Sequence, residues 1–75
     1  MKTCMIRLST IQDVRTLVDI VTSATTDVDL SSGRYVVDAK SIMGIFSLDL
    51  LKPIQLTAHE DDPALFEKLK PFIVE

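Results

Sequence analysis

The chain has 75 residues, about half the rough 150-residue length expected per domain, so we expect a single domain over residues 1–75. Its formal net charge is −3 and its 8 basic residues are scattered, which argues against direct binding to a nucleic-acid backbone. No apolar run approaches the roughly 18 residues of a membrane-spanning helix, and a single cysteine cannot form an internal disulfide, so we expect a cytoplasmic protein.

The first third of the chain predicts a strand and then a helix. Residues 2–8 carry apolar side chains at every second position, as in a half-buried strand: Cys4, Ile6 and Leu8. Two overlapping capping boxes, Ser9 with Gln12 and Thr10 with Asp13, predict where the helix starts. We expect it to end between residues 21 and 24 and to bury one stripe of side chains: Val14, Leu17, Val18 and Val21.

Residues 27–39 predict a β-hairpin. Val28 and Leu30 alternate with aspartates, and residues 35–39 alternate again after a turn. Gly33 supplies the positive φ that a tight turn requires. We therefore expect two antiparallel neighbouring strands.

A short helix should follow the hairpin, with Ser41 as its N-cap and residue 42 as its first residue. Pro53 should close this helix within about three turns. Two arrangements of its apolar side chains are open. In one, Ile42, Met43 and Phe46 form an exposed patch around Gly44. In the other, the buried stripe leaves only Met43 and Phe46 exposed and consists of Ile42, Ile45 and Leu48.

The end of the chain predicts a fourth strand over residues 54–58 and a last helix. Asp62 is expected to cap this helix, with Pro63 at its first position and an end near Lys70. The acidic run at residues 60–62 is therefore interpreted as a helix start, and no metal site or cofactor is expected. His59 precedes this run, and we expect a surface histidine hydrogen-bonded to an acidic neighbour.

The element order is strand, helix, strand, strand, helix, strand, helix. For a chain of this size, it predicts an α+β fold with a four-stranded antiparallel sheet and three helices on one face.

The run from Lys40 to Gly44 resembles HPr, the phosphocarrier protein of the bacterial sugar phosphotransferase system, and a looser resemblance extends from about residue 3 to residue 72. It implies the open-faced β-sandwich of that family. HPr carries its phosphoryl group on a histidine in a histidine, alanine, arginine, proline run. Aligned without gaps, that run falls on residues 10–13, so Thr10 and Gln12 occupy the places of the histidine and arginine. We expect neither carrier nor enzyme activity.

The resemblance implies a non-carrier protein of sugar-transport regulation and catabolite repression. Its Ser41 would be phosphorylated by an HPr-type serine kinase, and a transcriptional regulator or phosphotransferase components would bind nearby. The residues implied in binding are Lys40, Ile42, Met43, Gly44 and Phe46. One alternative is a structural or dimerisation module that forms a homodimer without phosphorylation. A weaker alternative is a phosphocarrier that uses Thr10 or His59.

Overall fold

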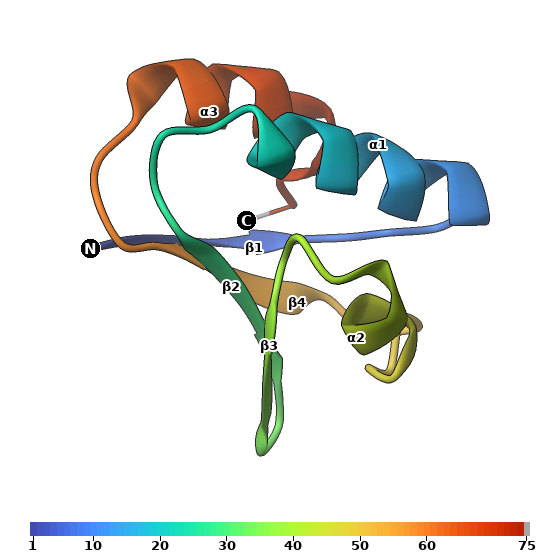
Figure 1. The fold of residues 1–75 in the computed structure, drawn as a ribbon. Coiled ribbons are helices and arrows are strands. Elements are labelled where there is room, and N and C mark those ends of the chain that lie inside the picture. The colour runs from blue at the N-terminus through green and yellow to red at the C-terminus, as the bar shows by residue number, and fades with distance from the viewer. Residues whose placement is uncertain (75) are drawn as a thin grey trace.

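The computed structural model describes residues 1–74 and confirms the predicted order of elements (Figure 1). Glu75, the last residue of the expected domain, lies outside the described residues. None of the described helices is long and apolar enough to cross a bilayer. The elements are β1 (Lys2–Ile6), α1 (Ile11–Thr22), β2 (Val28–Ser32), β3 (Tyr35–Asp38), α2 (Ile42–Phe46), β4 (Ile54–Ala58), α3 (Pro63–Leu69) and the 3₁₀ helix η1 (Lys70–Phe72).

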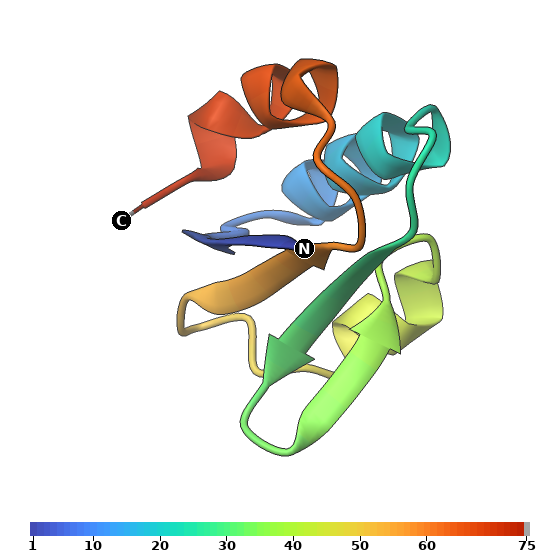
Figure 2. The same ribbon diagram turned by 90° about the vertical axis from the view of Figure 1, so that its left-hand side faces the viewer.

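The four strands form one antiparallel sheet in the order β1-β4-β2-β3. β1 and β4 pair so that Lys2 lies opposite Ala58 and Ile6 lies opposite Ile54. The hairpin of β2 and β3 forms as predicted, and Gly33 in its turn has a φ of 60°. Figures 1 and 2 show α1 and α3 side by side over one face of the sheet, while the hairpin projects away from them.

The core lies between the sheet and the helices. The alternating side chains of β1, β2 and β4 turn inward, and α1 packs on them through Val14, Leu17 and Val21, which are fully buried. Each such aliphatic side chain contributes about 1.5–3 kcal/mol by leaving water. The opposite face of the sheet carries mainly polar side chains, among them Thr3 and Gln55, so the two-layer, open-faced prediction is confirmed.

The C-terminal segment covers the outer edge of β1. Ile73 forms an isolated antiparallel bridge with Ile6. On either side of it, the N–H of Arg7 donates to the carbonyl of Phe72 at 2.9 Å and that of Val74 donates to Met5 at 3.0 Å. β1 ends at residue 6 rather than at residue 8 as predicted. Its pairing with β4 stops where Ile6 lies opposite Ile54, and Pro53, the residue before β4, has no N–H with which to extend the ladder.

α2 is short, as predicted, but Pro53 is not the residue that ends it. The helix has five residues and ends well before Pro53. The Ser47 hydroxyl donates to the carbonyl of Gly44 at 2.5 Å, and Asp49 Oδ1 accepts from the N–H of Leu51 at 3.1 Å. Short polar side chains that bond the nearby backbone offer it an alternative to the helix, and here they end α2 within its second turn.

Candidate protein-binding surface at two helix starts

The first turn of α1 is closed by its own side chains. Thr10 is the N-cap, and its hydroxyl accepts from the N–H of Asp13 at 3.0 Å. Asp13 Oδ2 in turn accepts from the N–H of Thr10 at 3.2 Å and of Ser9 at 2.9 Å. Of the two predicted capping boxes, only this one forms. The Gln12 side chain donates to Thr16 instead, at 3.4 Å, so the box of Ser9 with Gln12 is a correction to the prediction.

This hydrogen bonding makes Thr10 poorly suited to carry a phosphoryl group. A phosphocarrier needs an imidazole nitrogen as nucleophile at a helix start, where N–H groups and the helix dipole stabilise the phosphoryl oxygens. Here a hydroxyl is engaged in capping, and the carboxylate of Asp13 supplies the negative charge at that position. A second anion would be repelled by it.

The first turn of α2 has a different arrangement. Ser41 is the N-cap as predicted, and its exposed hydroxyl accepts from the N–H of Gly44 at 3.1 Å. No acidic residue lies in this first turn. The chain approaches through a turn in which Asp38 Oδ1 accepts from the N–H of Lys40 at 2.9 Å, and Lys40 is itself exposed. An anion attached to Ser41 would therefore meet no carboxylate within the first turn of α2, where the N–H groups favour negative charge, and the carboxylate of Asp38 lies in the turn before it.

Gly44 has a steric role beside this cap. A Cβ atom at residue 44 would lie 3.2 Å from Ser41 Oγ and 3.2 Å from Val37 Cβ. The bare backbone of glycine thus leaves the space in which the Ser41 side chain folds over the helix start.

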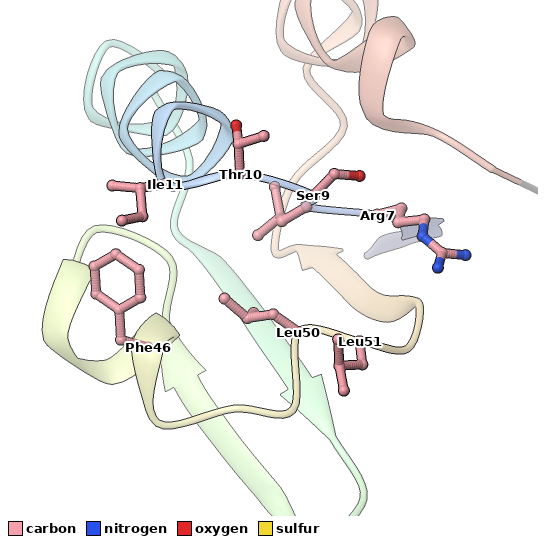
Figure 3. Close-up of a pocket in the computed structure, with 8 residues that line it drawn as sticks. Arg7, Ser9, Thr10, Ile11, Phe46, Leu50 and Leu51 are labelled. Carbon is pink, nitrogen blue, oxygen red and sulfur yellow. The ribbon is translucent and has the colours of Figure 1, made fainter.

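The start of α1 and the end of α2 meet at a pocket of about 320 Å³ (Figure 3). Ile11, at the start of α1, points toward the ring of Phe46 from α2, and Leu50 lies across from both. Much of this apolar surface is open to solvent: Ile11 is 64% exposed and Phe46 is 43% exposed. The pocket is lined by Arg7, Leu8, Ser9, Thr10, Ile11, Phe46, Leu50 and Leu51.

The structure separates the residues that the sequence grouped around Gly44. Met43 is 77% exposed and Phe46 lines the pocket, whereas Ile42 is partly buried against the core and Ile45 is fully buried. The second of the two predicted arrangements is therefore correct. Sequence reasoning missed Ile11, Leu50 and Leu51. The leucine pair could have been found from the sequence. Leu50 and Leu51 are adjacent apolar residues shortly before Pro53, and no predicted strand would bury them.

His59 lies at the opposite end of the sheet from the start of α1. It follows Ala58, which pairs with the first residue of β1, whereas the last residue of β1 leads toward α1. Its Nε2 is 2.6 Å from Asp29 Oδ2, so the acidic partner belongs to β2 and not to residues 60–62 as expected. This hydrogen bond raises the pKa of His59, and the negative charges of Asp29 and Asp27 act in the same direction, while desolvation lowers it.

The acidic run at residues 60–62 starts α3 as predicted, because Asp62 Oδ1 accepts from the N–H of Leu65 at 3.2 Å. Across residues 1–74, no three His, Cys, Asp or Glu side chains come together as a metal ion would require.

The class that this architecture defines is the HPr-like open-faced β-sandwich. A crystal structure of HPr-C-His from Thermoanaerobacter tengcongensis matches it with a TM-score of 0.79, covering 95% of this chain and 89% of that one. The two sequences are 23% identical, so the likeness establishes the fold. No protein-family model and no curated protein matches the sequence.

Proposed function

We propose that this protein is a non-carrier, HPr-like regulatory module of the cytoplasm that binds protein partners and is controlled by phosphorylation of Ser41. The observation that carries the proposal is the contrast between the two helix starts. At α1 a carboxylate already caps the backbone, whereas at α2 an exposed serine hydroxyl does so and the first turn holds no acidic residue. The HPr-like fold supports the same reading, because the proposed regulatory serine lies on an HPr-like framework.

A phosphate on Ser41 would change the surface more than the fold. It adds about −1.5 to −2 charges and three acceptor oxygens at a helix start, where they can still accept from the N–H of Gly44. Lys40 is exposed beside it. The modified site would offer oxygens to an arginine of a partner.

The exposed apolar side chains beside Ser41 supply the remaining contact area. Met43 suits an adaptable contact because its thioether chain is flexible, and Phe46 presents an aromatic face at the pocket mouth. We infer that a transcriptional regulator or a phosphotransferase component covers Met43 and Phe46 when Ser41 is phosphorylated. No chemistry on a small substrate is part of this proposal.

Incubation with an HPr-type serine kinase and ATP, followed by intact-mass measurement, tests the phosphorylation. We expect one phosphate on the wild type and on Thr10→Ala, and none on Ser41→Ala. The proposal is wrong if the wild type stays unlabelled under conditions that phosphorylate an HPr with its carrier histidine, or if Ser41→Ala is labelled equally.

A second experiment tests the binding surface. Calorimetric titration of the phosphorylated protein into an HPr-responsive transcriptional regulator should show binding that Met43→Glu and Phe46→Glu weaken at least tenfold, a difference of about 1.4 kcal/mol. Asp19→Ala, an exposed change on α1 outside the pocket, should have no effect.

A further inference from the structure

The two outer edges of the sheet differ in whether another segment of the chain covers them. The outer edge of β1 is covered by residues 72–74 through the bridge of Ile73 to Ile6. The outer edge of β3 has no such cover, because β3 is the last strand in the sheet order and no segment of residues 1–74 pairs with its outer side. An uncovered edge presents unpaired N–H and C=O groups that can pair with another strand.

The direction of these groups follows from the hairpin. The N–H of Ala39 donates to the carbonyl of Val28 at 2.9 Å, so the backbone of residue 39 points toward β2. Backbone polar groups alternate in direction along an antiparallel strand. Residues 35 and 37 therefore also face β2. The N–H and C=O groups of Val36 and the N–H of Asp38 point outward, whereas the Asp38 carbonyl accepts from the N–H of Ser41 at 2.9 Å.

The side chains of β3 do not block pairing. Val36 is 65% exposed and Tyr35 is 70% exposed. Natural edge strands are commonly protected by lysine or another charge, by proline, by a bulge or by being very short. β3, with the sequence YVVD, has no lysine, proline or bulge, and its one charged residue is Asp38 at the end of four residues. An exposed apolar edge of this kind is suited to adding a strand.

We propose that β3 pairs antiparallel with β3 of a second copy of this chain, about a two-fold axis at Val36. In this register the outward-facing Val36 residues form a hydrogen-bonded pair, and Arg34 of each copy lies opposite Asp38 of the other. Both charged residues are exposed. Asp38 is the last residue of β3, and Arg34 lies in the turn directly before this strand. The edge is thus complementary in charge to a copy of itself.

The neighbouring register is less favourable. An axis at Val37 would place Arg34 of one copy opposite Lys40 of the other, and like charges directly across a strand pair are destabilising. Charge therefore selects the register at Val36. The dimer joins the two sheets into one, and Met43 and Phe46 lie outside the paired edge, so the inference goes beyond the regulatory surface proposed above.

Self-association is measured by sedimentation velocity over a rising concentration series. We expect the wild type to pass from monomer to dimer and Val36→Lys to remain monomeric. The matched control is Met43→Lys, which introduces the same charge at an exposed apolar site on α2 and should dimerise like the wild type. Circular dichroism checks that each variant is folded.

Two charge reversals test the register. Arg34→Glu alone and Asp38→Lys alone should each dimerise at least tenfold more weakly, because each copy then faces a like charge. An equimolar mixture of these two variants should recover dimerisation, because every cross-strand pair in the mixed dimer is again of opposite charge. In the wild type, hydrogen exchange at the N–H groups of Val36 and Asp38 should slow as concentration rises.

A wild type that stays monomeric throughout the series overturns the proposal. So does a dimer that survives Val36→Lys but is lost in Met43→Lys, since it would then form through α2. A dimer lost in Val36→Lys whose charge variants do not recover on mixing overturns the register at Val36.

Discussion

The pocket lies between the start of α1 and the end of α2, and the N–H groups at the starts of these two helices are satisfied differently. At α1, Thr10 and Asp13 bond each other reciprocally, and the carboxylate takes two backbone N–H groups. At α2, a single exposed hydroxyl on Ser41 accepts one N–H. One start already holds its negative charge and the other is free to gain one. The proposed phosphorylation of Ser41 is based on this difference.

The two helices also differ in how they are held. α1 has 12 residues and three fully buried side chains, whereas α2 has five residues and only Ile45 is fully buried. A helix of five residues is not stable by its own backbone hydrogen bonds and depends on tertiary packing. We therefore infer that burial of Ile45 stabilises the short helix whose N-cap is Ser41.

Ile45→Ala should have the largest effect among these variants. Truncating a fully buried isoleucine costs about 2–5 kcal/mol, because transfer energy is lost and a cavity remains. Urea unfolding measures the loss, and phosphorylation of Ser41 should decrease with it. Met43→Ala, on the same helix but exposed, should change the free energy of unfolding by less than about 0.5 kcal/mol. Equal effects of the two variants would contradict the anchoring role of Ile45.

Thr10→Ala should have the next largest effect. We expect the free energy of unfolding to fall by about 0.5–2 kcal/mol, because an N-cap that accepts a helix N–H is removed. Gln12→Ala should stay within about 0.5 kcal/mol, since its side chain contacts only a neighbouring threonine. Thermal or urea unfolding measures both. A larger loss for Gln12→Ala than for Thr10→Ala would mean that the other capping box forms in solution.

Substitution of Ser41 should lower the free energy of unfolding by less than substitution of Thr10. Ser41→Ala removes a cap from a shorter, exposed helix, and we expect a loss near the lower end of the range, about 0.5 kcal/mol. Ser41→Asp should be close to neutral, because aspartate is as good a cap and its charge suits the helix start. Unfolding in urea separates the two. If Ser41→Asp destabilises by more than about 1 kcal/mol, a negative charge is not tolerated at α2.

Local signals were sufficient for the order of elements and for most of the helix starts. Ser41 and Asp62 cap α2 and α3 as predicted, because an N-cap is defined by residue type and a few neighbours. The apolar periods of β1 and α1 likewise identified their buried faces. Where α2 ends was not predictable in this way. The apolar spacing continues through Leu48, while the hydrogen bonds of Ser47 and Asp49 decide the outcome.

The pocket could not be predicted because it joins residues 7–11 to residues 46–51, which are distant in sequence. The helical period places Ile11 on the same stripe as Val14, yet Ile11 is exposed and faces Phe46. The partner of His59 was missed for a related reason. Pairing of β2 with β4 brings Asp29 diagonally beside His59, and this neighbour is 30 residues away in the chain.

The last and smallest predicted effect concerns the pKa of His59. It tests whether this residue, at one end of the sheet, is independent of the start of α1. Because Asp29 raises the pKa of His59, the folded protein holds this proton more tightly than the unfolded chain does. The resulting stabilisation is complete below the ordinary histidine pKa of about 6.5 and is lost as the pH rises through the raised value. An NMR titration of the imidazole should show a lower pKa in Asp29→Asn. Asp13→Asn, the matched change at α1, should leave it unaltered, and an equal decrease in both variants would place His59 in the field of the α1 start.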